Sequence, residues 1–454
     1  MGILALISLL SLFSGATRAV HPAQHISHSA ILPHAEFAIP FTAKRPRRES
    51  KKHALRGLRG IYSKLRTNTV ALDGGAFDTE YLVNITIGGK NFQVIMDTGS
   101  SDTWVVHTNF TCFDLSGNSI PAAACEFGPA QFDPADSLTF QLFPNVTFFV
   151  RYGSGESLSG PAGFDTVTVG ELSVSKQEIG IPNHNAFLGD GVSEGVFGLA
   201  FPELTSVWNT TTAQNASGSN HILYNPFFLN AIQQNKIQNF FSISLNRPTF
   251  NQQAHDPFDP HLGFLAFGGS VPIPITDTAV TVPIQRYAAN AAHIFVPSDA
   301  ANATFTWYTV DIDSYTFPGS STVPTTNNNT ILDTGTTLNW VPTAVAVAYN
   351  AQFSPPATLD SDLGVYVVDC NATAPPFSVV LGGTSFAVDP RDQIVPQANH
   401  KDVDGNTICV SGTQDEGLDV PGNIFTLGDV FLHNVVVTYN PVDDEVTVAQ
   451  RPHY

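Results

Sequence analysis

Short apolar segments, broken by glycine, proline, asparagine and aspartate, recur along the chain from about residue 77 to its end. Within many of them apolar and polar residues alternate, which is the period of a strand with one buried face. This pattern predicts β-strands at Tyr81–Ile87, Phe92–Met96, Phe148–Tyr152, Thr166–Val169, Phe240–Leu245, Leu262–Phe267, Ile294–Val296, Thr306–Ile312, Tyr366–Val368, Val435–Tyr439 and Val446–Ala449. Two segments favour a short helix, Pro226–Gln234 and Thr343–Gln352. The chain is therefore expected to be mostly β.

Two stretches between the predicted strands lack this alternation. Residues 205–225 are rich in threonine, asparagine and serine, and residues 248–261 contain Pro248, Pro257 and Pro260. Such compositions are typical of loops. We expect both stretches to be surface insertions, and the second to lie near the junction between two halves of the protein.

Residues 1–19 have the pattern of a secretory signal peptide. The apolar run Ile3–Phe13 is too short to cross a bilayer, and small residues follow it up to Ala19. No later segment favours a membrane helix, so no membrane association is predicted. Sequons agree with secretory passage and begin at Asn84, Asn109, Asn145, Asn209, Asn215, Asn302, Asn328 and Asn371. We expect a secreted, extracellular protein, with a vacuolar destination as the alternative.

Charge divides the sequence into a basic N-terminal part and an acidic remainder. The first 66 residues carry a formal +9 and the remaining 388 a formal −28. The acidic part would repel nucleic acid and anionic membranes, and it is compatible with either acid stability or simple solubility. A basic arm could bind nucleic acid or act as a localisation signal. Behind a signal peptide, residues 20–70 are better interpreted as a removable pro-segment that neutralises the acidic body.

Four cysteines, one pair in each half, suggest disulfides in a secreted protein. Three pairings are possible, of which the local one, Cys112–Cys125 with Cys370–Cys409, is the simplest. Free buried thiols are the alternative. There is no C-x-x-C and no histidine cluster with zinc-like spacing, so no metal site is predicted.

An eight-residue motif occurs twice, 236 residues apart, as Asp97–Trp104 and Asp333–Trp340. Aspartate, threonine, glycine and tryptophan fall at the same offsets, and each copy follows an apolar strand. A glycine after two bulky residues, Gly198 and Gly428, also recurs at a similar distance beyond each copy, as close backbone packing would require. With 454 residues available, a duplicated lobe is expected, with one carboxylate from each half.

Two carboxyl groups that share one proton can hydrolyse a peptide bond, because one activates water while the other donates a proton. Gly99 and Gly335 would let the backbone approach and donate N–H groups to the carboxylates. Ser100 and Thr336 would hydrogen-bond the outer oxygens and favour ionisation of one member. The alternative is that Asp97 and Asp333 are solvated residues in two unrelated turns.

The paired motifs, Tyr152-Gly153-Ser154-Gly155 and Leu427-Gly428-Asp429 together resemble the pepsin-type aspartic endopeptidases, in the style of secreted fungal members. The resemblance runs from about residue 77 to the end and includes the cysteine arrangement. It implies a bilobal fold of two β-rich lobes, residues 71–250 and 251–454, with the active site in the cleft between them. It also implies a monomer that needs no cofactor, an extended polypeptide substrate, and Thr98 and Thr334 interlocked across the pseudo-twofold axis.

The resemblance assigns a flap and a substrate pocket. Tyr152, Gly153 and Ser154 would form a hairpin that closes over substrate, with Tyr152 hydrogen-bonded to Trp104; outside this context Tyr152 would be an ordinary half-buried strand residue. Ser154 stands where some fungal relatives carry an aspartate, so cleavage next to lysine, including trypsinogen activation, is expected to be weak. Apolar subsites would involve Ile95, Phe187 and Val196, although all three could equally be core residues.

In the pro-segment, Tyr62 and Lys64 are candidates to plug the site, with the lysine between the two aspartates until acid weakens the contact. They could also be plain basic linker.

Other activities fit the sequence less well. Residues 191–195 read G-x-S-x-G, but a glycine-rich turn precedes the serine and an apolar strand follows it, so a serine-hydrolase elbow is not expected. A glycosidase could also use two carboxylates, without twin Asp-Thr-Gly loops. A catalytically silent binding or inhibitor protein of the same fold is the alternative from another class. We predict an acid-activated endopeptidase with apolar preference.

Overall fold

The structure is a computed structural model that describes residues 69–75, 80–247, 259–289, 295–297, 303–320, 323–324, 329–360, 364–401, 405–417 and 424–454. The predicted signal peptide, Tyr62, Lys64 and nearly all of the predicted pro-segment lie outside these residues.

The strands of the first half of the chain are β1 (Thr69–Gly75), β2 (Glu80–Ile87), β3 (Lys90–Asp97), β4 (Thr103–Val105), β5 (Thr111–Phe113), β6 (Ser119–Ile120), β7 (Gln141–Leu142), β8 (Thr147–Arg151), β9 (Ser157–Gly160), β10 (Ala162–Val169), β11 (Leu172–Gly180), β12 (His184–Ala186), β13 (Gly195–Gly198), β14 (Val207–Trp208), β15 (His221–Ile222) and β16 (Phe241–Leu245). The helices here are η1 (Ala122–Cys125), η2 (Pro134–Asp136), η3 (Pro202–Leu204), η4 (Ala213–Asn215) and α2 (Phe227–Gln233).

The strands of the second half are β17 (Asp259–Phe267), β18 (Ala279–Pro283), β19 (Tyr287–Ala289), β20 (Phe295–Pro297), β21 (Thr309–Thr316), β22 (Val323–Pro324), β23 (Asn329–Leu332), β24 (Asn339–Val341), β25 (Thr358–Asp360), β26 (Val365–Val368), β27 (Phe377–Leu381), β28 (Thr384–Val388), β29 (Ile394–Lys401), β30 (Thr407–Ser411), β31 (Thr413–Asp415), β32 (Ile424–Leu427), β33 (Val435–Asn440) and β34 (Glu445–Gln450). The helices are α4 (Thr343–Asn350), η5 (Pro390–Gln393) and α5 (Asp429–Leu432).

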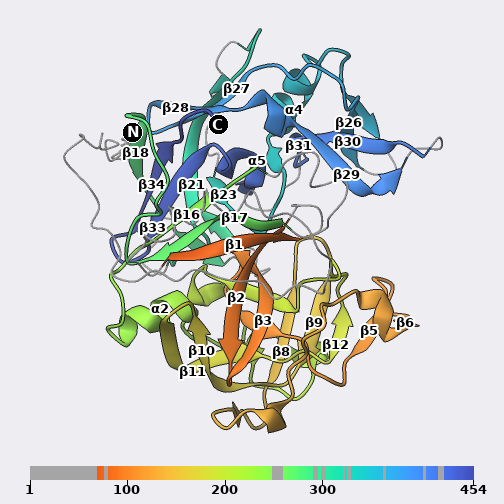
Figure 1. The fold of residues 1–454 in the computed structure, drawn as a ribbon, viewed down its shortest axis with the longest axis vertical. Coiled ribbons are helices and arrows are strands. Elements are labelled where there is room, and N and C mark those ends of the chain that lie inside the picture. Colours follow the sequence, from red (N-terminus) through yellow and green to blue (C-terminus); the bar gives the residue numbers. More distant parts are fainter. Residues whose placement is uncertain are drawn as a thin grey trace, which may run out of the picture.

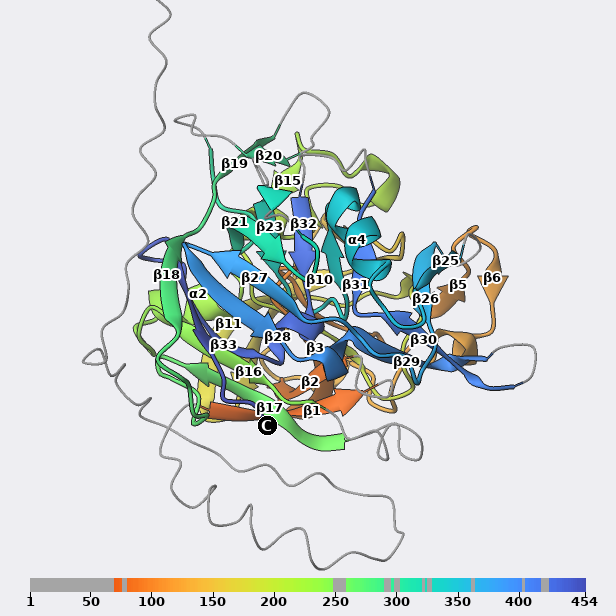
Figure 2. The same ribbon diagram turned by 90° about the horizontal axis from the view of Figure 1, so that it is seen from above.

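Two β-rich lobes meet at a shared set of strands. In Figure 1 the lower lobe contains β2, β3, β8 to β12 and α2, and the upper lobe contains β21, β23, β26 to β31 and α4. Between them run β1, β16, β17 and β33, part of one 13-stranded sheet. In this sheet β1 pairs with β17, and β16 pairs with both β17 and β33. Viewed from above, β1, β16 and β17 lie side by side along one edge (Figure 2). Backbone hydrogen bonds therefore join the two halves.

Aromatic side chains fill the core where the halves meet. Tyr308 from the second half packs against Phe201 of the first, with ring centroids 4.9 Å apart, and against Tyr439 at 4.6 Å. Tyr439 in turn stacks on Phe241 at 4.8 Å. The buried cluster that contains these rings extends through both halves. Its apolar burial supplies the main driving force for holding the lobes together.

Most predicted elements form within a few residues of their expected bounds. The alternating segments become β2, β3, β10 and β33, and the two expected helices become α2 and α4. The cysteines pair locally, as Cys112–Cys125 and Cys370–Cys409. None of the helices in the described ranges is both long and apolar enough to span a bilayer.

The prediction that residues 205–225 form a surface insertion is wrong at both ends. Ser206, Val207 and Tyr224 are buried: Val207 pairs with Phe148 of β8, and Val207 and Tyr224 belong to the same buried cluster as Phe148. The middle of the segment is largely exposed. Of the second expected insertion, residues 248–258 lie outside the described residues.

Candidate active site

Two loops of matching sequence leave the ends of two parallel strand pairs. In the first half, β3 ends at Asp97 and runs parallel to β13, with Asp97 opposite Gly198. In the second half, β23 ends at Leu332 and runs parallel to β32, with Leu332 opposite Leu427. The backbone N–H of Asp333 continues this ladder by donating to the carbonyl oxygen of Leu427 at 3.1 Å. The duplication seen in the sequence is thus a duplication of local structure.

The recurring glycines lie against the backbone of these loops. A Cβ atom on Gly198 would come within 2.5 Å of the carbonyl carbon of Ser101, and one on Gly428 within 2.1 Å of the carbonyl oxygen of Thr336. Real Cβ contacts are never this short, so each position needs a glycine. The close packing expected from the sequence is confirmed.

The two loops interlock through their threonines. The hydroxyl of Thr98 donates to the carbonyl oxygen of Leu332 at 2.8 Å and accepts from the backbone N–H of Thr334 at 3.0 Å. The hydroxyl of Thr334 makes the mirror pair, donating to Met96 O at 2.8 Å and accepting from Thr98 N–H at 3.1 Å. Both threonines are buried. Four hydrogen bonds in a dry environment therefore fix one loop relative to the other.

The Asp97 carboxyl is held by its own loop. The backbone N–H of Gly99 donates to its Oδ1 at 2.7 Å, and the Ser100 hydroxyl donates to its Oδ2. Two donors fix the plane of the carboxyl group and stabilise its charged form.

The Asp333 carboxyl has the same two supports, from Gly335 N–H at 2.8 Å and Thr336 Oγ1 at 2.7 Å. Each carboxyl also faces the glycine of the opposite loop. A Cβ on Gly99 would lie 2.6 Å from the Asp333 carboxyl, and one on Gly335 would lie 2.5 Å from Asp97 Oδ1. The structure thus brings together two carboxyl groups from residues far apart in sequence.

Burial and proximity change the ionisation of this pair. Asp97 is only 8% exposed, and its burial together with the charge of Asp333 raises its pKa to about 8, against the lowering effect of hydrogen bonds from Ser100 and Gly99. A pair of this kind titrates as a unit, so a single proton stays on it across a wide pH range.

The β8–β9 hairpin carries Tyr152 at its turn. The backbone N–H of Tyr152 donates to Glu156 O at 2.9 Å, and Gly155 closes the turn with φ +92°. The indole N–H of Trp104, on β4 of the 13-stranded sheet, donates to the Tyr152 hydroxyl at 2.7 Å. The Phe187 ring packs against both, with centroids 5.9 Å from Tyr152 and 5.5 Å from Trp104. The hairpin expected as a flap is therefore anchored to the motif that contains Asp97.

The expected subsite residues lie beneath this hairpin. Ile95 and Val196 belong to a buried cluster with Trp104, at 8% and 3% exposure, and Tyr152 and Phe187 pack on its edge. At the tip, Gly153 and Ser154 are exposed, and the Ser154 hydroxyl donates to Glu156 Oε2 at 2.9 Å. A subsite role for Ile95 and Val196 stays a prediction, because such burial is also that of core residues.

The sequence matches the family described as eukaryotic aspartyl protease over residues 80–451, a range that contains both aspartate loops and the hairpin. The chain belongs to the eukaryotic aspartyl proteases. The predicted identity as a pepsin-like, aspartic-type peptide hydrolase is thereby confirmed.

Relatives of this protease include fungal enzymes. A probable aspartic-type endopeptidase of Aspergillus fumigatus is 36% identical over 84% of this chain and 80% of its own length. Endothiapepsin of Cryphonectria parasitica is 31% identical over 80% of this chain and 73% of its own length. Among solved structures, the aspartic proteinase from Irpex lacteus superposes with a TM-score of 0.62 at 20% identity, covering 84% of this chain and 97% of that one. The likeness confirms the expected bilobal, mostly β fold.

Three residues near the catalytic loops were assigned no role from the sequence. Trp307, from the second half, donates its indole N–H to the carbonyl oxygen of Gly99 at 3.1 Å, and nothing in the sequence indicates this contact. Asp429 is 1% exposed, and burial with the charge of Asp333 raises its pKa well above its usual range. It belongs to the Leu427-Gly428-Asp429 stretch that contributes to the family resemblance, although the sequence pattern assigns it no role. The third is Asp102, which lies inside the first motif.

The G-x-S-x-G segment, residues 191–195, does not have the structure of a serine-hydrolase elbow. The Ser193 hydroxyl donates to Asp190 Oδ1 at 2.8 Å, and strand β13, not a helix, follows.

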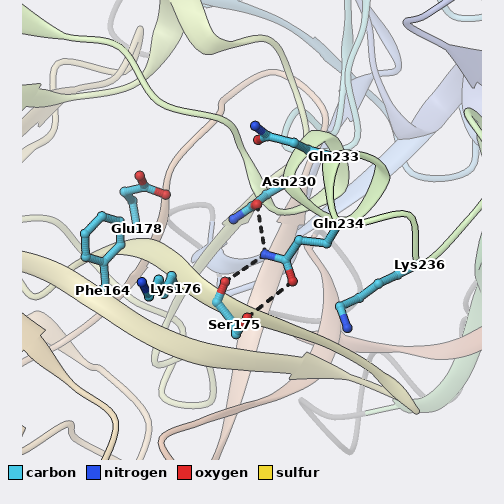
Figure 3. A pocket seen from close by; sticks show the side chains of 8 residues that line it. All are labelled: Phe164, Ser175, Lys176, Glu178, Asn230, Gln233, Gln234 and Lys236. Carbon is cyan, nitrogen blue, oxygen red and sulfur yellow. Dashed lines mark hydrogen bonds between the residues drawn. The ribbon is translucent and has the colours of Figure 1, made fainter.

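A polar hollow of about 660 Å³ lies on the outside of the first lobe, between β11 and α2 (Figure 3). Its lining residues are Phe164, Ser175, Lys176, Glu178, Asn230, Gln233, Gln234 and Lys236. The Gln234 amide bonds Ser175 O at 2.8 Å and Asn230 Oδ1 at 3.0 Å, so it serves to join the helix to the strand. None of the predicted site residues lines this hollow.

Proposed function

We propose that this protease cleaves peptide bonds with Asp97 and Asp333 acting together as general base and general acid. The observation that supports this most is the close approach of the two carboxyl groups, each facing the glycine of the other loop. Like charges so close together disfavour ionisation of both, as is established for aspartic proteases as a class. One ionised and one protonated carboxyl are then available at acidic pH.

The reaction proceeds by direct attack of water. The ionised carboxylate takes a proton from water while the water oxygen bonds to the substrate carbonyl carbon. The protonated carboxyl gives its proton to the carbonyl oxygen, and a neutral tetrahedral diol forms. As the C–N bond breaks, the carboxyl that is now ionised takes a proton from one diol hydroxyl. The carboxyl that is now protonated gives its proton to the departing nitrogen. The rigid threonine interlock keeps both carboxyl groups in position throughout.

Digestion of denatured haemoglobin or casein tests this assignment. We expect turnover at about pH 3 and little at pH 7, inhibition by a statine-type compound, and no effect of a chelator. Asp97→Asn and Asp333→Asn should each lower kcat by at least about 10³-fold, because neither half of the pair can act alone. Asp443→Asn, the same change on an exposed turn, should leave kcat unaltered. Full turnover by either dyad variant would refute the roles. A well-folded wild-type protein that binds the inhibitor without turnover would instead indicate a silent binding protein.

The flap and the apolar cluster beneath it support a preference for bulky apolar residues on both sides of the cleaved bond. Ile95, Phe187 and Val196 would line these subsites, and an extended substrate would hydrogen-bond the flap backbone at Gly153 and Ser154. Cleavage-site mapping on a peptide library would test this. Cleavage mainly next to lysine would contradict it.

We further propose that the protein is secreted as a monomeric zymogen. Residues 1–19 would be removed on secretion, and residues 20–70 would cover the cleft between lobes 71–250 and 251–454 until acid protonates the carboxylates of the body. The opposite formal charges, +9 for the first 66 residues and −28 for the remainder, support a pro-segment that binds the body at neutral pH and is released in acid. N-terminal sequencing of the secreted protein before and after acidification should show the loss of about 50 residues. An unchanged N-terminus in an active protein would exclude acid-triggered removal.

A further inference from the structure

Asp102 is a buried carboxyl inside the first catalytic motif. It lies five residues after Asp97 and two before Trp104, and its side chain is 1% exposed. The equivalent position of the second motif is Leu338, so an acid here is no requirement of the loop fold itself. A buried carboxyl is expensive unless its contacts compensate, which makes its partners informative.

Both partners of Asp102 come from the segment after the first lobe's β13. The backbone N–H of Ser206 donates to Asp102 Oδ1 at 2.8 Å, and the Tyr224 hydroxyl donates to the same oxygen. The other oxygen, Oδ2, has no hydrogen-bond partner among the described residues. Ser206 and Tyr224 are themselves buried. The carboxyl thus fixes the two ends of residues 205–225 to the catalytic loop.

The same segment holds the flap strand. The carbonyl oxygen of Ser206 accepts from the backbone N–H of Phe149 on β8 at 2.9 Å, and the Trp208 indole donates to Phe149 O at 2.8 Å. Strand β14 pairs antiparallel with β8, with Val207 opposite Phe148. Three residues beyond Phe149, Tyr152 bonds Trp104, which returns the path to the motif containing Asp102. Catalytic loop, Ser206, flap strand and flap tyrosine form a closed circuit of hydrogen bonds.

We infer that Asp102 is a positioning residue for this protease, which sets the flap strand relative to the catalytic loop through Ser206 and Tyr224. The inference rests on the proposed function, since it assumes that the β8–β9 hairpin closes over substrate. Asp102 does not touch the reacting atoms in this role. It acts by fixing the base of the hairpin, so that the tip reaches the same place in each turnover.

The ionisation of Asp102 adds a pH dependence to this role. Burial raises its pKa to about 6, although hydrogen bonds from Tyr224 and Ser206 lower it in part. The titratable groups that interact with Asp102 are two phenols, Tyr224 and Tyr152; further carboxyls interact with these phenols, Glu178 with Tyr224, and Asp97 and Glu156 with Tyr152. No cation appears among these groups, so an ionised Asp102 has no compensating charge there. We expect the circuit to be most stable when Asp102 is neutral, below about pH 6.

Three variants test the inference, with kcat and KM measured from pH 3 to pH 7. Asp102→Asn keeps an acceptor oxygen for Ser206 and Tyr224 and cannot ionise. It should retain kcat/KM within about twofold at pH 3.5 and lose less activity than wild type between pH 5 and pH 7. Asp102→Leu removes the acceptor and should lower kcat/KM about tenfold at pH 3.5, while Tyr224→Phe should give a smaller loss.

Asp165 provides the matched control. It is an equally buried aspartate of the same lobe, also with one oxygen lacking a partner in the described structure, but it bonds Thr139 and the backbone of Thr166, away from the flap. Asp165→Asn should leave the shape of the pH profile unchanged.

Overlapping pH profiles for Asp102→Asn and wild type, together with an unchanged kcat/KM in Tyr224→Phe, would overturn the inference even if Asp102→Leu failed to fold. That result would leave the endopeptidase assignment intact. A wild-type protein without activity or statine binding would instead contradict the proposed function, so the two failures are distinguishable.

Discussion

Two glycines determine how closely the carboxyl groups of Asp97 and Asp333 can approach. A Cβ atom on Gly99 would lie 2.6 Å from the Asp333 carboxyl, and one on Gly335 would lie 2.5 Å from the Asp97 carboxyl. A methyl group at either place would push the pair apart, and a displacement of about 1 Å can lower a rate about 10²-fold.

Gly99→Ala should therefore lower kcat about 100-fold or more while the protein stays folded. Steady-state kinetics at pH 3.5 together with a thermal unfolding scan would measure both effects. Gly117→Ala is the control, since an added methyl there meets no atom within 4 Å, but its φ of +82° is strained for alanine. It should lose about 1 kcal/mol of stability and keep its kcat. Equal loss of kcat in the two variants would mean that destabilisation, not displacement of the carboxyl groups, explains the effect.

The threonine interlock predicts a stability effect at the same scale. Thr98→Val keeps the shape but removes the donor to Leu332 O and the acceptor for Thr334 N–H, both buried. Leaving these groups unpaired should lower the free energy of unfolding by about 2–4 kcal/mol. Urea unfolding at pH 4 measures this, with Thr98→Ser as the variant that restores the hydroxyl. A Thr98→Val protein as stable as wild type would show that the interlock contributes no stability.

Residue-level features were predictable where the sequence repeats itself. Asp97, Gly99 and their second copies could be found because two matching motifs constrain each other. Trp307 could not, since its contact with Gly99 joins residues 208 positions apart and no local pattern marks it. The partners of Asp102 were hidden for the same reason, and because their segment looked like a polar loop.

At the scale of elements, one side-chain hydrogen bond joins the turn of the β8–β9 hairpin to Trp104 on β4. Removing the Tyr152 hydroxyl breaks its 2.7 Å bond with the Trp104 indole but leaves the ring packed on Phe187. A bond of this kind contributes about 1 kcal/mol, so Tyr152→Phe should lower kcat/KM about five- to tenfold. Tyr366→Phe, on β26 of the other half, is the matched control. Unaltered kinetics in Tyr152→Phe would mean that the hydroxyl does not position the flap.

Elements were predictable where one face of a strand is buried and the other exposed. Strand β10 illustrates this, because buried and half-buried residues alternate over most of its length. Strands β14 and β15 are only two residues long and lie within a Thr/Asn/Ser-rich stretch, so no period could appear. The pairing of β14 with β8, and of β15 with β14, is a tertiary effect, and tertiary packing overrides local composition.

On the scale of the whole molecule, the duplicated halves share a sheet that the sequence did not indicate. The pairing of β16 with β33 joins Ile243 to Val437, and no local signal reports a contact at such separation. Beside it, Arg247 donates to Asp392 through its Nε and Nη2 atoms, and His433 bonds the same carboxyl at 3.1 Å. Burial raises the pKa of Asp392, but the charges of His433 and Arg247 outweigh it and lower the pKa overall. This ion network therefore persists in acid.

Several other carboxyls, buried or half-buried, have a raised pKa instead. Burial and the charge of Asp333 raise the pKa of Asp97 to about 8, and burial alone raises that of Asp102 to about 6. It raises the pKa of Glu178, Glu194 and Glu416 to about 7 each. Unfolding returns each group to an ordinary carboxyl pKa near 4, so between about pH 4 and pH 8 the folded protein binds more protons than the unfolded chain. Stability must then fall as the pH rises through this window.

Below about pH 4 the pH dependence of stability reverses, and stability falls as the pH is lowered. Burial raises the pKa of Asp389, but hydrogen bonds from Arg391 and the charge of Arg247 outweigh it and lower the pKa to about 2. Its stabilising contribution is present above the unfolded pKa and is lost as the pH falls towards 2. We therefore expect the unfolding temperature of the protease to be highest between about pH 3 and pH 5 and to fall steadily towards pH 8. Differential scanning calorimetry at constant ionic strength, with a bound statine-type inhibitor in a parallel series, would measure this. An unfolding temperature that stays level or rises from pH 5 to pH 8 would show that these carboxyls are not buried in the neutral form, and the acid preference would then have to come from the catalytic pair alone.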